Sequence, residues 1–119
     1  MDSLEELGIY DLNEAYIRKG LDPVIFIRHL LDRIEKLEPT LGAFELVLSE
    51  RALAAAESVK ASFSSGYRIG PFHGIPFVLK DLVHVADTVT TGGTNAYAHR
   101  ISGETATIAH RLLVGGGIL

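Results

Sequence analysis

The chain has 119 residues, of which 47% are hydrophobic and 22% are charged, and its formal net charge is −4. This composition is typical of a globular protein with one modest domain, and it excludes the disordered and fibrous classes. The acidic balance argues against a nucleic-acid partner. The absence of cysteine excludes a disulfide framework, thiolate metal sites and cysteine nucleophiles.

Residues 1–6 are acidic and amphipathic, the opposite of the basic and apolar layout of a secretory signal peptide. No apolar run approaches the roughly 20 residues that a membrane-spanning helix needs. The sequence therefore predicts no membrane segment, and the cytoplasm is the expected compartment.

The first part of the chain, residues 1–65, is rich in acidic residues and poor in glycine, which predicts helices. A first short helix is expected from Asp11 to Lys19, with Gly20 as its C-terminal stop. Charged residues of this part are expected on the solvated faces of the helices. They include Arg28, Arg33, Lys36, Glu50, Arg51 and Lys60.

Two longer helices follow. Asp22 can cap a helix that begins at Pro23, because proline is favoured at the first helical position. Apolar residues at helical spacing continue this helix up to Pro39: Ile27, Leu30, Leu31, Ile34 and Leu37. Ser49 can cap a third helix, which the run 64–66 ends. One face of that helix carries Ala52, Ala56, Val59 and Phe63.

Residues 66–119 hold most of the glycines and few charges, which indicates strands and tight loops. After a loop at 70–74, the short apolar run Ile75–Leu79 favours a strand over a helix. Pro76 is tolerable near the beginning of such a strand but not in its middle.

A last amphipathic helix fits Thr105 to Val114, with Ile108, Ala109, Leu112 and Leu113 grouped on one side. The glycine triplet 115–117 then turns the chain, and residues 118–119 have the character of another buried strand. A chain that stops two residues into an apolar strand is unusual, because termini are commonly exposed.

Lys80 ends the predicted strand abruptly. Both faces of the strand are apolar up to this residue, which predicts cover on both sides, as in α/β sheets. Such sheets place their sites beyond the carboxyl ends of strands. One interpretation is that Lys80 simply extends from the core to water. The other is a partly desolvated lysine, since burial favours the neutral amine that can accept a proton.

A wider pattern favours the second interpretation. In order along the chain come Gly70–Asp81 (GPFHGIPFVLKD), Thr90–Thr94 (TTGGT), Thr105–Leu112 (TATIAHRL) and the glycine turn at 115–117. This order resembles the front of the amidase signature family, which typically shows a G-P-L-H-G-I-P-hydrophobic-K-D segment, a T-T-x-G-S/T patch and a D-A-T-V-V-x-R-L helix. The resemblance covers nearly the whole chain and is most specific at residues 70–94.

Three positions depart from the family pattern. Leu82 stands where asparagine is frequent, Asp87 replaces a common glycine, and Thr105 replaces the usual aspartate at the start of the helix. Threonine can still cap a helix, somewhat less well than aspartate. The changes at Leu82 and Asp87 concern substrate detail.

The resemblance implies hydrolysis of small carboxylic amides, or transfer of the released ammonia, through a Ser–Ser–Lys arrangement without a cofactor. Lys80 would be the catalytic lysine. It would act as a general base through a bridging serine on a cis peptide, which activates the nucleophilic serine.

Neither family serine has a match in this chain. Ser102 is the only serine after Lys80, and it precedes a helix instead of lying in a Gly/Ser-rich segment. The pair at 64–65 precedes the lysine and marks a helix end, and Thr94 matches a family position of structural character. We therefore interpret the chain as the N-terminal piece of a longer amidase that is inactive alone. The alternative is a non-catalytic relic or a helical interaction module.

The five histidines (29, 73, 84, 99 and 110) show no two-ligand helical spacing, so no metal site is expected. The family match suggests that His73 shapes the loop before the strand. The expected fold class is α/β, truncated: residues 1–65 form a helical part, and residues 66–119 carry the lysine motif, one helix and the first strand or strands of the amidase signature mixed sheet. The oligomeric state is left open.

Overall fold

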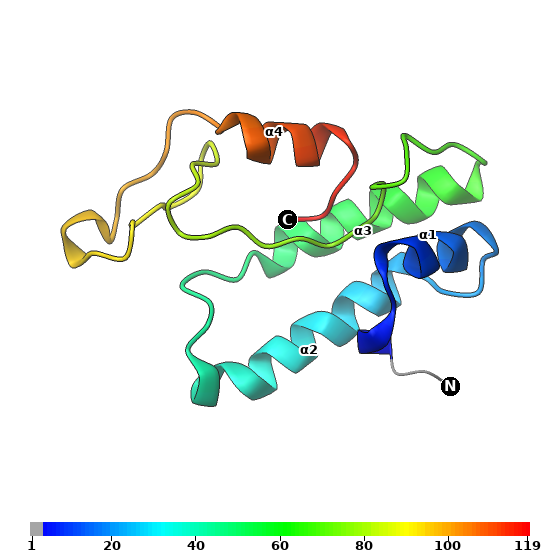
Figure 1. Cartoon of the computed structure of the whole chain (residues 1–119), viewed down its shortest axis with the longest axis horizontal. Coiled ribbons are helices and arrows are strands. Elements are labelled where there is room, and N and C mark those ends of the chain that lie inside the picture. Colours follow the sequence, from blue (N-terminus) through cyan, green and yellow to red (C-terminus); the bar gives the residue numbers. More distant parts are fainter. Residues whose placement is uncertain (1–3) are drawn as a thin grey trace.

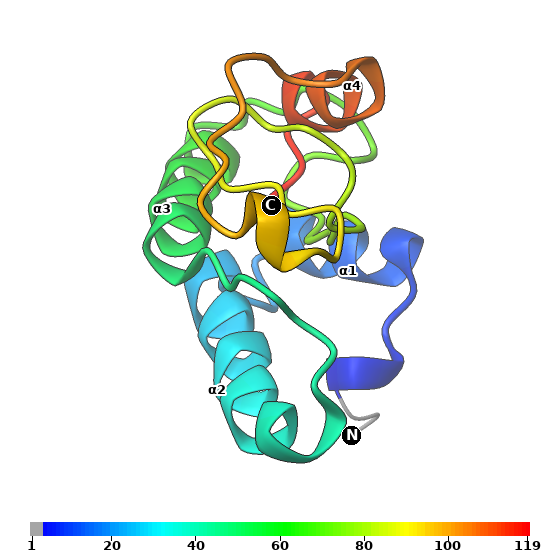
Figure 2. The same cartoon turned by 90° about the vertical axis from the view of Figure 1, so that its left-hand side faces the viewer.

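The computed structural model describes residues 4–119. In this range it shows the α-helices α1 (Ile9–Ile17), α2 (Pro23–Leu41), α3 (Ser49–Ser64) and α4 (Thr107–Val114). Two short 3₁₀ turns, η1 (Leu4–Glu6) and η2 (Asn95–Tyr97), complete the regular structure of this range. Helices α2 and α3 lie side by side, and α4 lies away from α2, beyond α3 (Figures 1 and 2). None of the helices in this range is long and apolar enough to cross a membrane.

Helix α1 begins and ends two residues earlier than the sequence predicts. It begins at Ile9, after Gly8 as the N-cap, and ends at Ile17. Lys19, the predicted last residue, takes a left-handed backbone conformation with φ 55°. A right-handed helix cannot continue through such a residue. The predicted stop at Gly20 is therefore already made one residue before it.

Helix α2 has the predicted start. Oδ1 of Asp22 accepts hydrogen bonds from the N–H groups of Val24 at 2.8 Å and Ile25 at 3.4 Å, and Pro23 is the first helical residue. Oδ2 of the same aspartate forms an ion pair with Nζ of Lys60 on α3 at 2.7 Å. Asp22 therefore both caps α2 and ties its first turn to α3.

The predicted end of α2 is wrong, because Pro39 lies inside the helix. A proline near the end of a helix removes one N–H donor but does not force the next residue out of the helical conformation. The helix ends at Leu41, after which left-handed Gly42 (φ 56°) donates its N–H to the Glu38 carbonyl at 2.9 Å. The glycine, which readily adopts positive φ, determines the end of α2.

Helix α3 has the predicted extent but not the predicted cap. Ser49 is its first helical residue, and the N-cap position is taken by Leu48 without a side-chain hydrogen bond. The predicted inner face is confirmed, since Ala52, Ala56 and Val59 are buried. Small residues on this face let α3 pack directly on the apolar stripe of α2.

Two apolar clusters form the core of the described part of the chain, residues 4–119. The first joins α2, α3 and the end of the chain through Val24, Ile27, Ala52, Ala56, Val59 and Ile118. The second joins α1, the start of α2 and the second half through Leu12, Tyr16, Phe26 and Ile75. Each cluster thus contains one residue of the otherwise loop-rich second half.

The strand predicted at Ile75–Leu79 is not formed within residues 4–119. Its one ladder contact is an isolated parallel bridge between Pro76 and Ile118. The N–H of Phe77 donates to the Ile118 carbonyl, and the Ile118 N–H donates to the Ile75 carbonyl, both at 2.9 Å. The two apolar runs therefore pair as neighbours, but the α/β sheet that the sequence predicts is not present in this range.

A second isolated bridge, antiparallel, joins Val89 to Ile101. Helix α4 begins at Thr107 with Ala106 as N-cap, so the predicted start at Thr105 is wrong. The Thr105 hydroxyl instead accepts a hydrogen bond from the Ala86 N–H at 3.0 Å. The threonine closes a loop and does not cap the helix.

The glycine triplet after α4 is explained by close packing. A Cβ atom on Gly117 would lie 2.6 Å from Cε1 of Phe72, and one on Gly116 would lie 2.7 Å from Cδ2 of His73. Gly116 also has a left-handed backbone with φ 88°. Side chains at these positions would push the last residues away from the loop before Ile75.

Candidate functional site

Lys80 lines an open, mostly apolar groove of about 920 Å³. The groove lies between α2, the connection from α2 to α3 and the segment that leads to Lys80. Its apolar lining includes Ile27, Leu31, Ile34, Phe44, Leu48 and Phe77. The arrangement therefore sets one lysine beside a large apolar surface.

The predicted cover on both faces is not observed. Ile75 is 3% exposed and packs toward the helices, whereas Val78 is 68% exposed and Lys80 is exposed as well. The helices cover one side of this segment, and no residue within 4–119 covers the other. The dry environment expected around Lys80 is therefore not formed by the described part of the chain.

The backbone at Lys80 is nevertheless fixed by a tight turn. Its carbonyl accepts hydrogen bonds from the N–H groups of Leu82 at 2.7 Å and Val83 at 3.0 Å. The chain reverses immediately after the lysine, which leaves its side chain at the outer end of the segment.

Asp81 binds the threonine–glycine loop that lies ten residues further along the chain. Its Oδ1 accepts from the Thr91 N–H at 2.9 Å, its Oδ2 accepts from the Thr91 hydroxyl, and its main-chain carbonyl accepts from the Gly92 N–H at 2.8 Å. These bonds favour the ionised form. The Thr91 hydroxyl above all, then the Thr91 N–H, with smaller help from Gly93 and Arg100, holds the pKa of Asp81 below its usual range.

The loop that Asp81 holds is Thr90–Thr94. Gly92 and Gly93 both have left-handed backbones, with φ 63° and 78°. The Gly93 N–H donates to the Thr91 hydroxyl at 3.0 Å, and the Thr94 hydroxyl accepts from the Ala96 N–H at 3.3 Å as the cap of η2. The N–H groups of this loop are thus used inside the protein, and Thr94 has a structural role.

Arg100 closes the same region from the other side. Its Nε donates to the Thr90 carbonyl at 3.2 Å, and its guanidinium carbon lies 4.3 Å from the ring centroid of Tyr97. It also lies near enough to Asp81 to favour the carboxylate. The charges around the lysine turn are therefore of both signs.

Ser102, the only serine after Lys80, does not lie at this site. It is buried (4% exposed), and its Oγ lies 2.9 Å from Oγ1 of Thr90 and 3.1 Å from Nδ1 of His84. The side chains of Ser102, Thr90 and His84 form a polar cluster. It joins the segments of the Val89–Ile101 bridge to the segment that follows the turn at Lys80. Ser65 donates to the Ser62 carbonyl at the end of α3, as expected for a helix end.

His73 shapes the loop before Ile75, as the family resemblance suggests. Its Nδ1 accepts from the Ile69 N–H at 3.2 Å, and its ring stacks on Phe63 with centroids 5.2 Å apart. Burial first, and the nearby Arg68 guanidinium second, lower the pKa of His73. Both effects, like the hydrogen bond that Nδ1 accepts, favour the neutral ring.

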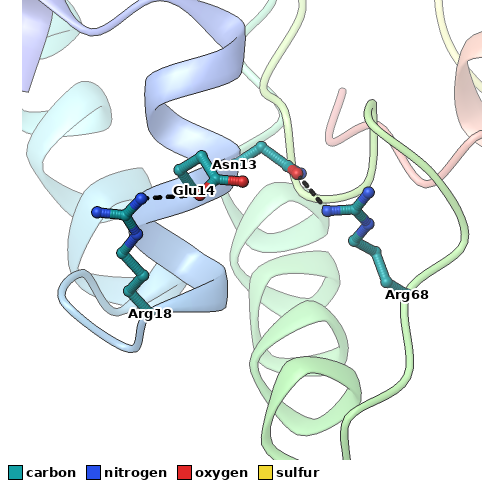
Figure 3. A network of polar contacts seen from close by, with 4 residues as sticks. All are labelled: Asn13, Glu14, Arg18 and Arg68. Atoms are coloured by element: carbon teal, nitrogen blue, oxygen red, sulfur yellow. Dashed lines mark hydrogen bonds and ion pairs between the residues drawn. The ribbon is translucent and has the colours of Figure 1, made fainter.

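A polar network ties this loop to α1 (Figure 3). Nη1 of Arg68 donates to Oδ1 of buried Asn13 at 2.8 Å, and Nδ2 of Asn13 donates to the His73 carbonyl at 3.4 Å. Next along α1, Glu14 pairs with Arg18 at 3.3 Å on the surface. Asn13, a polar residue on the inner face of an amphipathic helix, was not predicted from the sequence.

No group of three or more His, Asp or Glu side chains within residues 4–119 is placed to hold a metal ion. The hydrogen bonds of Asp81 to the Thr90–Thr94 loop were not predicted from the sequence either. The signal that could have found them is a carboxylate next to the lysine, followed by a Thr-Thr-Gly-Gly loop whose N–H groups need an acceptor.

Comparison with known proteins gives consistent matches. The sequence profile of the family described as Amidase matches residues 26–119. AmiD of Mycobacterium bovis is 30% identical over 118 residues, which are 99% of this chain and 25% of AmiD. A glutamyl-tRNA(Gln) amidotransferase subunit of Trichodesmium erythraeum is 32% identical over 112 residues, which are 94% of this chain and 23% of that subunit.

A solved structure agrees with these matches. The native peptide amidase from Stenotrophomonas maltophilia superimposes with a TM-score of 0.85 at 28% identity, over 98% of this chain and 24% of the peptide amidase. The chain therefore spans about a quarter of the length of the relatives that it matches.

Proposed function

Because the chain belongs to the amidase family, we propose that it supplies the general base, Lys80, of an enzyme that hydrolyses small carboxylic amides. The observation that carries the proposal is the position of Lys80. It lies within the most family-specific stretch, residues 70–94, and lines a large groove. Its backbone is fixed by the turn to Val83.

The chemistry follows from what a serine nucleophile needs. A hydroxyl is a weak nucleophile until a base removes its proton, and the base must lie within hydrogen-bond reach. In the proposed mechanism the neutral amine of Lys80 takes a proton from a bridging serine, which takes the proton of the attacking serine. The amine later returns this proton to the leaving nitrogen of the amide, and water then releases the acyl group.

The serines of this mechanism belong, in the proposal, to the three quarters of the amidase fold that this chain does not match. Ser102 is engaged with Thr90 and His84, and Ser65 lies at the far end of α3. The remaining fold would cover the groove and the outer side of Val78. That cover would exclude water from Lys80 and favour its neutral form.

A substitution at Lys80 tests the proposal. The complete polypeptide is recovered from its source, its intact mass is measured, and ammonia release is assayed with a panel of small carboxylic amides. Lys80→Ala should lower the rate by a factor on the order of 10² to 10⁴, because a general base is lost. The melting temperature should stay close to that of the wild type, since Lys80 is exposed.

Lys36→Ala is the matched control, because Lys36 is an exposed lysine on α2 outside the groove lining. It should leave the rate unchanged. A Lys80→Ala enzyme with wild-type activity would refute the assignment of the base. Hydroxylamine is added as a second acceptor of the acyl group. A hydroxamate product indicates transfer to an amine, and a free carboxylic acid indicates transfer to water.

The second candidate is a non-catalytic interaction module, which the exposed apolar groove favours. Leu46, at 48% exposed, and Val78 extend this apolar surface to solvent. An intact mass of 12.9 kDa without amide hydrolysis would favour this candidate.

A further inference from the structure

Asp81 accepts three hydrogen bonds from the Thr90–Gly93 part of the Thr90–Thr94 loop. Both carboxylate oxygens of Asp81 accept hydrogen bonds from Thr91, one from its N–H at 2.9 Å and one from its hydroxyl. The main-chain carbonyl of Asp81 accepts from the Gly92 N–H at 2.8 Å. The acceptors of this one residue therefore fix two consecutive peptide units of the loop.

The same residue is bonded on its N-terminal side as well. The Lys80 carbonyl, which belongs to the peptide unit between Lys80 and Asp81, accepts from the N–H groups of Leu82 and Val83 at 2.7 and 3.0 Å. The peptide unit between Lys80 and Asp81 is thus held at the Lys80 carbonyl by the turn, and at Asp81 by the hydrogen bonds to the loop. It cannot rotate without breaking bonds on both sides.

Asp81 is suited to this task and not to proton transfer. Hydrogen bonds from Thr91 hold its pKa below the usual range, so it remains a carboxylate that only accepts hydrogen bonds. Charge-assisted bonds of this kind are stronger than neutral ones. We call the hydrogen bonds that Asp81 accepts from Thr91 and Gly92 the clamp. Thr91 donates two of them and is only 6% exposed, so part of the clamp is sheltered from water.

A fixed backbone matters for a lysine base. The lysine stem is long and flexible, and a base acts only when its nitrogen lies within hydrogen-bond reach of the proton that it takes. Holding the Cα atom of Lys80 in place reduces the volume that the lysine nitrogen can reach, and it does so without any contact to the amine itself. Small displacements of a catalytic group lower rates strongly.

We infer that Asp81 is the positioning residue of this site: it joins the Thr90–Gly93 loop and the backbone of Lys80 into one rigid unit. The inference rests on the proposed role of Lys80 as the base. It assigns no contact with substrate to Asp81 or to Thr91.

The first arm of the test measures rigidity on the 119-residue chain. Asp81→Asn removes the charge and places an amide donor opposite the Thr91 hydroxyl. Thr91→Val removes that hydroxyl and keeps the shape of the side chain. In both variants we expect hydrogen exchange at the Gly92 amide to rise by a factor on the order of 10. The ¹⁵N order parameter of the Lys80 amide should fall together with it.

Asp87→Asn is the matched control. Asp87 is exposed, its side chain lies outside the clamp, and asparagine tolerates its left-handed backbone, with φ 60°. This variant removes the same charge and should change neither reading. An unchanged Lys80 order parameter in Asp81→Asn and Thr91→Val, with the loop loosened, would overturn the inference whether or not the protein hydrolyses amides.

The second arm measures kinetics on the complete polypeptide. Asp81→Asn and Thr91→Val should each lower kcat by a factor of about 10 or more with KM unchanged, because substrate binding is not touched. The kcat of the double variant should be no lower than that of the less active single variant, because both substitutions break the same set of hydrogen bonds. Full kcat in Asp81→Asn would overturn the inference, whereas an active Lys80→Ala enzyme would instead refute the assignment of the base.

Discussion

Residues 4–65 and residues 66–119 are held by different kinds of contact. The first region is built from three helices whose buried faces are mostly apolar, with small and branched residues between α2 and α3 and the aromatic Tyr16 and Phe26 beside α1. The second region has one helix of eight residues and two isolated bridges, and hydrogen bonds among turns replace a ladder. Apolar packing is tolerant of small changes, whereas a network of turns depends on individual donors and glycines.

The two regions are nevertheless not independent. Ile118 is 2% exposed within the cluster between α2 and α3, and Ile75 is 3% exposed within the cluster beside α1. These two side chains anchor the loop-rich region on the helices. Damage to the helical core should therefore spread to the loops, while damage to the loops should remain local.

The largest expected effect comes from Ile27→Ala, which empties a site between α2, α3 and Ile118. Ile27 is 3% exposed, and removing a buried isoleucine side chain lowers the free energy of unfolding by about 2 to 5 kcal/mol. Thermal or urea unfolding measures the loss. Amide exchange should show reduced protection at both Ala56 and Ile118.

Ile25→Ala is the control for this variant, because Ile25 lies on the same helix but is 60% exposed. Its effect should stay within about 0.5 kcal/mol. If Ile27→Ala lowered protection in the helices and left Ile118 protected, the two regions would be independent. That result would contradict the view that Ile118 and Ile75 anchor the second region on the helices.

A smaller and local effect is expected from Gly117→Ala. The new Cβ atom would lie 2.6 Å from Cε1 of Phe72 and 3.0 Å from the Leu112 carbonyl oxygen, so the turn after α4 must shift. Overpacking of this kind costs about 1 to 3 kcal/mol. We expect faster exchange at the Ile118 amide and unchanged protection at Ala56.

Gly103→Ala is the control, because no atom lies within 4 Å of its added Cβ. It should leave the exchange of the Ile118 amide unchanged. A global loss of stability in Gly117→Ala, equal at Ala56 and Ile118, would show that the second region is part of the same cooperative unit as the helices.

The same contrast explains how far the sequence could be read. Helical spacing and the Asp22–Pro23 start predicted α2 and the inner face of α3, because these depend on neighbours in the sequence. The ends at Lys19 and Pro39 were wrong, since left-handed residues at Lys19 and Gly42 decided them. The strand predicted at Ile75–Leu79 is not formed within residues 4–119. A local sequence pattern cannot decide this, because a strand requires partners that distant residues supply.

The site was predictable to a similar extent. The motif identified the family, which the match over residues 26–119 supports, while the role of Lys80 stays a prediction. The cover expected around Lys80 is not formed within residues 4–119, because it depends on whatever packs on the outer side of Val78. The clamp formed by Asp81 and Thr91 joins two residues that lie ten positions apart in the sequence, and the periodicity of the sequence does not predict such a contact.

The smallest expected effect is a pH dependence confined to the second region. The Nδ1 atom of His73 accepts the Ile69 N–H, so protonation of the ring breaks this bond. The pKa of His73 in the folded chain lies below the ordinary value of 6.5, because burial and Arg68 disfavour the imidazolium. Below pH 6.5 the unfolded chain therefore binds more protons at this residue than the folded chain, so the free energy of unfolding decreases as the pH is lowered.

This contribution is complete above pH 6.5 and is lost as the pH falls through the lower value of the folded state. Between pH 7 and pH 5, the protection factor of the Ile69 amide should fall while that of Ala56 holds. His73→Gln should abolish the change, and His110→Gln, on the exposed side of α4, should preserve it. Equal losses at Ile69 and Ala56 would mean that acid acts on the helical core, and the loop would then not be the weaker region.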